Sequence, residues 1–404
     1  MDERRYFGLD ALRGSMMMLG IVLHAGMLYV AAVPGYPLPT DHNGSPVFGV
    51  LGPFIHFFRM PTFFVLAGFF TALLIEKRGL RGTYANRAKR ILAPLAAGVV
   101  TILPVTALFA ASFMVSARFG TREFIPDLDL LKALGRELTR KGLSADKPTL
   151  AHLWFLYYLC FFYLLIPLCR RLVQLSLVFE ARLRRWLVSP LLLPALAVCT
   201  AATLWPFPGG MVFMEYTNIV PHLPSLAYFA FFFVLGYVFH HYRDFLPVLK
   251  RRVPALALAA LVLFPVALAA AHFDLSVRGA SFVRHLGAVL ACALCTWSLI
   301  FLFLGCALRF FDRDSPWIVY VSQSAYWVYL VHLPLVELAG WWLLQFDFSG
   351  LLKFLLVCGF SASVAFVTFH YWVQNTWISD FLYGRRFDLD WPWRESRLKR
   401  DRGS

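Results

Sequence analysis

The sequence predicts an all-α, polytopic membrane protein with about ten transmembrane helices. Hydrophobic residues make up 59% of the 404 residues and charged residues only 15%, whereas soluble domains carry about 25% charged residues. The mean hydropathy of +0.65 comes from apolar segments along the whole chain and not from one anchor segment. Apolar runs of more than 20 residues contain Leu and Ala throughout, and this excludes the alternating pattern of a membrane β-barrel.

Apolar segments of about 20 residues are long enough to cross the hydrocarbon core as helices. Ten such segments can be placed, at 9–32, 51–75, 91–117, 151–169, 187–205, 222–242, 253–272, 285–308, 316–343 and 350–379. The loop at 118–150 carries charges of both signs, and we expect it to contain a short surface helix. Residues 1–380 would form a single transmembrane domain and 381–404 a basic cytoplasmic tail.

The distribution of Lys and Arg predicts that both termini are cytoplasmic. Of the 38 basic residues, 26 fall on the side of the termini and 10 on the opposite side, most of those in the loop at 118–150. Cytoplasmic loops carry such an excess in membrane proteins. The net charge of +15 therefore reflects topology, and we expect no nucleic-acid partner. The two basic residues left within the segments are Arg13 and Arg59.

Ionisable side chains at membrane depth are costly, so each is a candidate for function. Arg13 and His24 lie on one face of the first segment, about 16 Å apart along the axis, and would line one cavity at two depths. Arg59 lies at mid-depth and requires an anionic partner or water. His56 shares its face through the i, i+3 spacing. A lone histidine is often only an interior residue bonded to another helix, but Arg59 favours a functional interpretation.

Two further groups of polar residues stand out. Arg87 and Arg90 begin the third segment and either anchor it on the cytoplasmic side or clamp phosphate groups. His152 opens the fourth segment, where an interfacial aromatic belt would explain Trp and Tyr but not His. The cysteines show no convincing metal-binding spacing, and we expect no metal site.

The segment at 316–343 is unusually polar for a membrane helix. Its polar residues recur every three or four positions and form one stripe, made of Ser322, Tyr326, Tyr329 and His332. Such a stripe can join helices or line a cavity. Pro334 interrupts the hydrogen-bond ladder beside it and favours the cavity.

The N-terminal run from Arg5 to Gly14, followed by His24, resembles the opening of the membrane-bound acyltransferase family 3. That family has an Arg or Lys ten intervening residues before a His in its first span, as Arg13 and His24 are spaced here. The segments 63–69, 87–90 and 324–332 are similar to further motifs of the family. Within it, 58–61 and 152–158 look most like the periplasmic glucan succinyltransferases.

This resemblance implies an enzyme of the bacterial inner membrane that transfers an acyl group from cytoplasmic acyl-CoA. Succinyl-CoA is the expected donor, a periplasmic glucan or other envelope glycan the expected acceptor, and no cofactor would be permanently bound. His24 would be the general base. The remaining candidates are Tyr326 and His332 for catalysis, Arg13, Arg87 and Arg90 for the CoA phosphates, and Arg59, His56, His152 and Tyr329 for substrate binding. Glu337 or Glu215 could orient a histidine.

Three other interpretations remain open. The protein could be an O-acetyltransferase that acts on another envelope glycan. It could be a transporter or flippase for an anionic glycan or lipid, although no internal repeat is visible. A membrane scaffold would not explain the density of polar residues within the apolar segments. The sequence does not predict an oligomeric state.

Overall fold

The structure is a computed structural model, and it describes residues 6–31, 38–141, 149–212, 217–277, 279 and 281–388. These residues fold into helices and contain no β-strand, only isolated bridges such as that between Val30 and Ser45. The helices are α1 (Phe7–Leu28), α2 (Val47–Arg87), α3 (Ala93–Phe119), α4 (Leu128–Arg140), α5 (Trp154–Leu164), α6 (Ile166–Ser176), α7 (Glu180–Leu187), α8 (Leu192–Leu204), α9 (Leu223–His241), α10 (Leu246–Ser276), α11 (Phe282–Phe310), α12 (Pro316–Leu343), α13 (Gly350–Thr368) and α14 (Trp377–Tyr383). Short helical turns include η1 (Ala88–Leu92), η2 (Ala151–Leu153), η4 (Pro208–Gly210) and η7 (Phe369–Val373).

The all-α prediction is confirmed, and the structure has several helices that could cross a membrane. Within the described residues six helical segments are long and apolar enough, or seven if the bent pair 151–164 and 166–187 forms one span. One of the six, Val47–Phe119, has 73 residues and would extend about 110 Å if straight, far beyond a hydrocarbon core of about 30 Å. It contains two of the predicted spans. The figure of about ten therefore stays a prediction.

The predicted loop at 76–90 is helical. α2 continues through it and joins α3 through η1. Its charged residues are all Lys, Arg or Glu, which favour helix. The direction changes at Gly79, whose φ of 66° and ψ of 178° leave the helical region. That left-handed φ suits glycine because other residues meet a steric penalty there.

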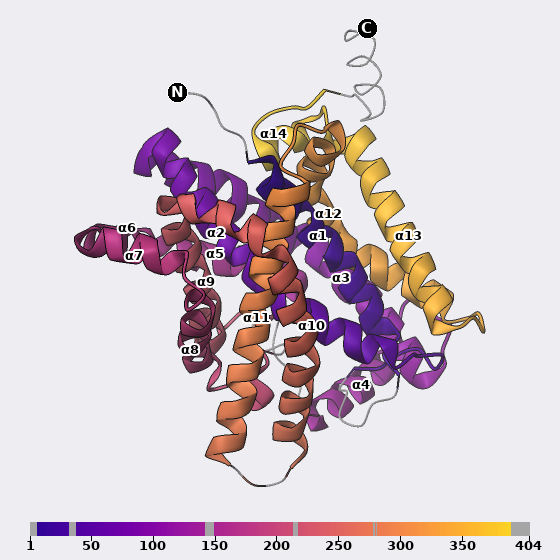
Figure 1. The fold of residues 1–404 in the computed structure, drawn as a ribbon. Helices are drawn as coiled ribbons and strands as arrows, with labels where there is room; N and C mark the ends of the chain where they lie inside the picture. The colour runs from indigo at the N-terminus through magenta and orange to yellow at the C-terminus, as the bar shows by residue number, and fades with distance from the viewer. Residues whose placement is uncertain are drawn as a thin grey trace, which may run out of the picture.

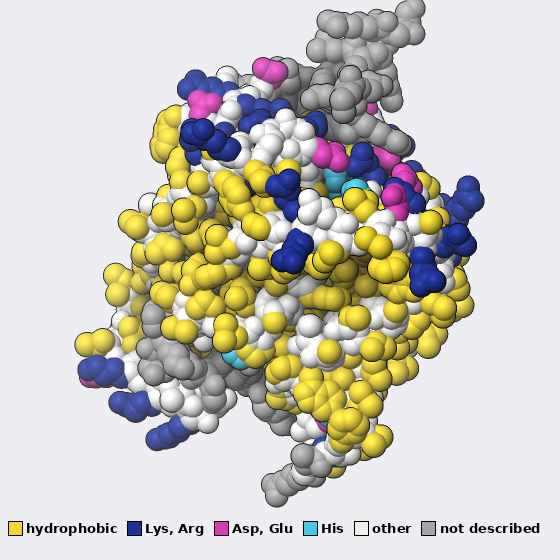
Figure 2. Space-filling model, turned by 90° about the vertical axis from the view of Figure 1, so that its left-hand side faces the viewer, with side chains coloured by type: hydrophobic (Ala, Val, Ile, Leu, Met, Phe, Trp, Pro, Cys, Tyr) yellow, Lys and Arg dark blue, Asp and Glu magenta, His cyan; other side chains and the backbone are white. Residues whose placement is uncertain are grey.

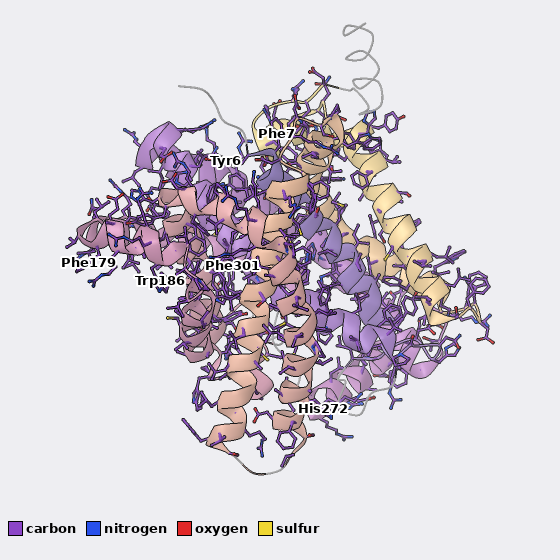
Figure 3. The ribbon with its side chains drawn as sticks, in the orientation of Figure 1. Tyr6, Phe7, Phe179, Trp186, His272 and Phe301 are labelled. Carbon is purple, nitrogen blue, oxygen red and sulfur yellow. The ribbon has the colours of Figure 1, made fainter. Side chains whose placement is uncertain are left out.

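The fourth predicted segment, 151–169, is not one straight helix. It comprises η2, α5 and the start of α6, with a bend of 53° between the α5 and α6 portions. Pro167 lies in the first turn of α6, where its missing N–H costs no helical hydrogen bond. α6 and α7 project sideways from the bundle (Figure 1), and Phe179 and Trp186 mark this projection in Figure 3.

The structure has a basic end, defined here as the end where α1 begins, α12 begins and α14 lies (Figure 1). Figure 2 shows Lys and Arg gathered over this end above a broad band of hydrophobic side chains, with fewer basic residues near the opposite end. α4 lies at the opposite end (Figure 1), and it confirms the short helix expected within 118–150. The Asp127 carboxylate caps α4 by accepting from the backbone N–H of Asp129 and Leu130.

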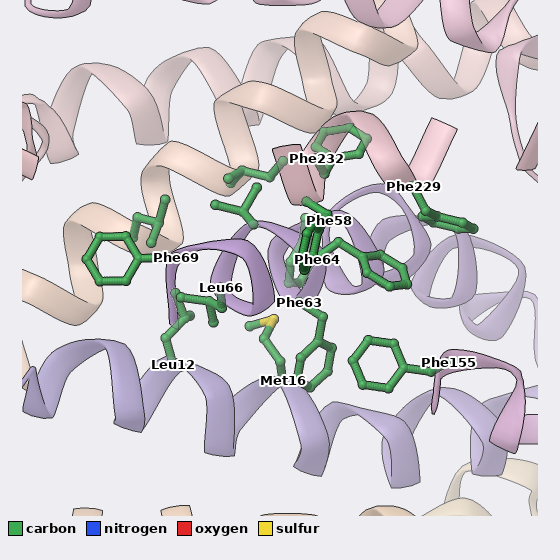
Figure 4. Packing of buried hydrophobic residues seen from close by; sticks show 14 of the residues in the cluster. Leu12, Met16, Phe58, Phe63, Phe64, Leu66, Phe69, Phe155, Phe229 and Phe232 are labelled. Atoms are coloured by element: carbon green, nitrogen blue, oxygen red, sulfur yellow. The ribbon is translucent and has the colours of Figure 1, made fainter. Parts of the chain in front are cut away.

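The core that positions the site is aromatic and lies around α2. The Phe64 ring lies 5.1 Å from that of Phe155 and 5.0 Å from that of Phe229, centroid to centroid. Figure 4 shows Leu12 and Met16 of α1 directed toward this cluster. α1 also packs along α12. Polar side chains on α1, α2 and α12 are therefore brought together inside the bundle.

Candidate active site

Three histidines from distant parts of the chain meet in the interior. His24 belongs to α1, His152 to η2 and His332 to α12. The His332 ring lies in the middle, with its centroid 5.3 Å from that of His24 and 5.2 Å from that of His152. His152 and His332 are buried and His24 is partly buried. We call these three residues the histidine cluster.

Hydrogen bonds fix which nitrogen carries the proton in two of these rings. The His332 Nδ1 lies 2.7 Å from the carbonyl oxygen of Tyr329, and the His152 Nε2 lies 3.0 Å from that of Leu330. A carbonyl oxygen only accepts, so these nitrogens donate. The other nitrogens, Nε2 of His332 and Nδ1 of His152, are buried without a hydrogen-bond partner. In the neutral rings each presents a lone pair, which is the requirement for a base or acceptor.

Arg59 places a buried cation beside the cluster. Its side chain is 6% exposed, and its Nε donates to the carbonyl oxygen of Met16 at 2.9 Å. A Cβ built on Gly20 would lie 2.5 Å from Nη2 of Arg59 and 3.1 Å from Nε2 of His332. Both groups therefore lie where the side chain of any residue other than glycine at position 20 of α1 would have to be. Gly20 could not be singled out from the sequence, because nothing in α1 alone indicates what approaches it.

The predicted stripe on α12 faces the interior, but both of its tyrosine hydroxyl groups already have partners. The Tyr329 hydroxyl donates to the carbonyl oxygen of His152 at 2.6 Å, and the Tyr326 hydroxyl donates to that of Arg90 at 2.9 Å. Both interpretations of the stripe thus apply. The tyrosines join α12 to η2 and η1, while His332 leaves one nitrogen unpaired.

A large cavity lies between α1, α2, α5 and α12. Its volume is about 640 Å³, and it is lined by side chains that include Tyr6 at the start of α1 and Phe387 near α14, so it reaches the basic end. Its lining residues carry five cationic groups, Arg13, Lys77, Arg87, Arg90 and Arg385, and one carboxylate, that of Asp10. This cationic excess suits an anionic ligand.

The three arginines predicted to bind phosphates all line this cavity. Arg13 is paired with the Asp10 carboxylate at 3.1 Å and donates to the Ser322 hydroxyl at 2.8 Å. Arg90 Nη1 donates to the carbonyl oxygen of Asp380 at 2.9 Å. The Nε atoms of Arg87 and Arg90 are buried without a hydrogen-bond partner. Arg87 and Arg90 thus each have a nitrogen that makes no hydrogen bond within the described residues.

The inner end of the cavity adjoins the histidine cluster. Phe63 and Phe155 line it. The Arg59 guanidinium carbon lies 6.0 Å from the Phe63 ring centroid, and the Tyr329 centroid lies 5.9 Å from that of Phe155. The cavity therefore ends against side chains that adjoin the cluster. His24 lies about 10 Å further along α1 than the cavity-lining Met17.

His56 does not line the large cavity. Its Nδ1 donates to the carbonyl oxygen of Gly52 at 3.3 Å. With Tyr228 and Thr296 it lines a separate cavity of about 30 Å³. The structure thus gathers Arg59, Tyr329 and the histidine cluster, and gives His56 different surroundings.

Neither predicted carboxylate is shown to orient a histidine. One carboxylate oxygen of Glu337 is buried without a partner, and Glu215 lies outside the described residues. The described ion pairs include none between the histidine cluster and an Asp or Glu. Nor do the described residues contain a group of three or more His, Cys, Asp or Glu side chains that could hold a metal ion.

The chain matches the acyltransferase family 3, described as "Acyltransferase domain", over residues 6–370. It is 24% identical over 382 residues to the glucans biosynthesis protein C of Escherichia coli strain SMS-3-5, with 91% of each chain covered. The K12 protein of the same name is 24% identical over 378 residues, again with 91% of each chain covered. No solved structure matches the chain.

The match covers nearly the whole chain, from α1 to η7. It therefore includes the histidine cluster and most of the cationic cavity. The chain belongs to the acyltransferase family 3, and it is an acyl-transferring, multi-pass membrane enzyme.

Proposed function

We propose that the protein transfers a succinyl group from cytoplasmic succinyl-CoA to hydroxyls of a periplasmic glucan. The observation that supports this most strongly is the cationic cavity that leads from the basic end to a buried cation and three histidines. The glucan acceptor is suggested by the relatives named glucans biosynthesis protein C.

The donor enters the cavity from the basic end. Arg13, Arg87 and Arg90 bind its phosphates, because guanidinium groups pair with phosphate oxygens through charge-assisted hydrogen bonds. The pantetheine arm then passes along the cavity toward Phe63 and Phe155. The thioester arrives where these side chains adjoin Arg59 and Tyr329.

His24 acts as the general base. It removes the proton from the acceptor hydroxyl as that oxygen attacks the thioester carbonyl carbon. The carbon–sulfur bond then breaks and the thiolate takes the proton back from His24, so that the products are an ester and free CoA. The His24 and His332 ring centroids lie 5.3 Å apart, and an N–H of His24 donated to the unpaired Nε2 of His332 would orient the base.

Arg59 makes the site prefer a succinyl group over an acetyl group. The distal carboxylate of succinate is an anion that needs a buried partner, whereas an acetyl group needs none. Arg59 is buried and adjoins the inner end of the cavity. It therefore binds this carboxylate next to the histidine cluster. Tyr326 and Tyr329 hold η1 and η2 in position around the donor.

This function requires a particular orientation in the bacterial inner membrane. The basic end faces the cytoplasm together with both termini, and the chain crosses the membrane about ten times. The charge distribution supports this orientation. The acceptor then reaches His24 from the opposite end.

The direct test is isotope transfer in membranes that contain the protein. Label from succinyl-CoA should appear as an ester on periplasmic glucan, and His24→Ala should lower the rate by about a hundredfold or more, the typical contribution of a general base. Gly26→Ala, in the same helix, serves as the matched control, because its Cβ would meet only side-chain atoms, the nearest at 3.3 Å.

Two results would contradict the proposal. Substantial transfer by a correctly inserted His24→Ala protein would remove His24 as the base. Movement of label across the membrane without ester formation would indicate a transporter.

A further inference from the structure

A second sizeable cavity lies at the end of the bundle opposite the basic end. Its volume is about 360 Å³. The ends of α3 and α12 and the segments that follow them form its walls. Its lining residues are His42, Ser116, Ala117, Gly120, Thr121, Arg122, Trp341, Trp342, Leu344, Gln345, Phe346 and Asp347. We call it the outer cavity.

One wall of the outer cavity presents aromatic faces. Trp342 is 55% exposed, and its ring lies 5.0 Å from that of Phe346 at an angle of 64°. The Trp341 ring packs edge-on against the Phe124 ring, with the two centroids 4.9 Å apart. An interfacial belt would explain single Trp residues at this height but not their arrangement around a hollow.

The other walls carry polar groups. Ser116 is 6% exposed, and its buried hydroxyl has no hydrogen-bond partner. An unpaired buried hydroxyl calls for a ligand or water. Asp347 accepts from the Asn43 amide at 2.8 Å, and this bond is the largest cause of the lowered pKa of its carboxyl group. Arg122 and Asp347 leave the lining close to neutral.

The segment 41–43, which contributes His42 to the lining, is anchored by a buried ion pair. Asp41 and Lys353 form a fully buried ion pair at 2.6 Å. The backbone N–H of Asn43 donates to the other Asp41 oxygen at 2.8 Å. Asn43 and its contact with Asp347 are thereby anchored to α13, so the polar wall is formed before any ligand arrives.

We propose that the outer cavity binds sugar residues of the glycan acceptor that are not themselves acylated. This inference rests on the proposed function. Sugars have apolar ring faces that stack on aromatic side chains and hydroxyls that pair with Ser, Arg and carboxylate groups. A cavity with a near-neutral lining suits a neutral glycan better than an anionic lipid headgroup.

The distance between the outer cavity and the histidine cluster determines which acceptors the outer cavity can bind. Trp341 follows His332 by nine residues, about 13 Å along the α12 axis. More than one sugar ring is needed to span this distance. The outer cavity would therefore distinguish a polymer from a single sugar, and it would act on acceptor binding without contributing to the chemical step.

The first test measures binding alone. A fluorescent gluco-oligosaccharide is titrated onto the full-length protein in nanodiscs, in the His24→Ala background so that no transfer occurs. Trp342→Ala should weaken binding about tenfold, because it removes the exposed stacking face. Trp377→Ala is the matched control, since Trp377 is 70% exposed and lies on α14 at the basic end.

The second test uses transfer kinetics with acceptors of different length. Trp342→Ala should raise KM for a long gluco-oligosaccharide about tenfold, leave kcat unchanged and leave a single-sugar acceptor unaffected. Ser116→Ala, which removes the unpaired hydroxyl, should shift KM in the same direction.

Equal oligosaccharide affinity of Trp342→Ala and Trp377→Ala would overturn the inference. So would displacement of the oligosaccharide by anionic lipid vesicles, which would indicate a lipid site. Because the binding test needs no acyl transfer, its outcome is independent of whether the proposed reaction is correct.

Discussion

Gly20 determines how closely Arg59 and His332 approach α1. A methyl group there would lie 2.5 Å from the Arg59 guanidinium and 3.1 Å from the His332 ring. We expect Gly20→Ala to displace both groups and to lower acyl transfer by about a hundredfold, the cost of moving reacting groups by about 1 Å. Transfer rates in membranes with equal amounts of inserted protein would measure this.

The control for Gly20→Ala is Gly14→Ala in the same helix. Its Cβ would lie 3.1 Å from a Val321 side-chain atom, outside the histidine cluster. Similar losses in both variants would mean that the effect comes from the packing of α1 and not from the site.

Arg59 should decide which donor the site prefers. Arg59→Leu removes the cation that would pair with the distal carboxylate of a succinyl group, so kcat/KM for succinyl-CoA should fall at least tenfold more than kcat/KM for acetyl-CoA. Competition between the two labelled donors in one membrane preparation gives the ratio directly. Equal losses for both donors would show that Arg59 has only a structural role.

At the residue level, the sequence singled out side chains that are unusual by themselves. Arg59 and His332 are conspicuous because polar groups are costly in a membrane. The protonation pattern of His152 and His332 depends on the carbonyl groups of Leu330 and Tyr329. No pattern in the sequence indicates those contacts, because they form only when η2 packs against α12.

At the scale of the helices, the crossing of α2 and α9 is unusually close. A Cβ on Gly68 would lie 1.9 Å from the carbonyl oxygen of Phe233, and one on Gly236 would lie 2.0 Å from that of Val65. Gly68→Ala must therefore separate two backbones, and we expect it to destabilise the protein by about 2 kcal/mol or more. Thermal unfolding in detergent would show a lower midpoint.

Gly49→Ala provides the comparison for Gly68→Ala. Gly49 lies in α2 as well, and nothing is within 4 Å of its Cβ position. Its midpoint should equal or slightly exceed that of the wild type, because alanine favours helix. A similar decrease in both variants would point to a general sensitivity of α2.

The buried pair of Asp41 and Lys353 joins the segment before α2 to α13. Both side chains are fully buried and 2.6 Å apart. Lys353→Met would leave the Asp41 carboxylate uncompensated and should cost about 3–5 kcal/mol. Adding Asp41→Asn should recover much of this loss, as thermal unfolding of the single and double variants would show. A further decrease in the double variant would contradict this interpretation.

The helices themselves follow from local composition, but their ends and bends do not. Each of the ten predicted segments overlaps one or more helices of the structure, although some run past the helix ends, as 9–32 does beyond Leu28. The extension of α2 through 76–87 was missed because charged residues were assigned to a loop, although most of them favour helix. The bend after Leu164 was also missed, since the apolar composition continues across it.

At the scale of the whole molecule, the basic end, the two cavities and the histidine cluster lie along one axis of the bundle. The cationic cavity reaches the basic end, the histidine cluster lies in the interior, and the outer cavity lies toward α4. The sequence predicted Arg13 and His24 as two levels on this axis from their spacing alone. It could not predict the outer cavity, because the lining comes from segments more than 200 residues apart in the chain.

This axis leads to a prediction of orientation. Lys132→Cys in α4 should react with a membrane-impermeant maleimide added to intact spheroplasts, because the loop at 118–150 would face the periplasm. Arg81→Cys, in the exposed last turns of α2, should react only after the membrane is opened, since the basic end would face the cytoplasm. The unmodified protein, with its seven free cysteines, gives the background labelling. The reverse pattern would place the cationic cavity on the periplasmic side, away from cytoplasmic CoA, and would be incompatible with the proposed direction of transfer.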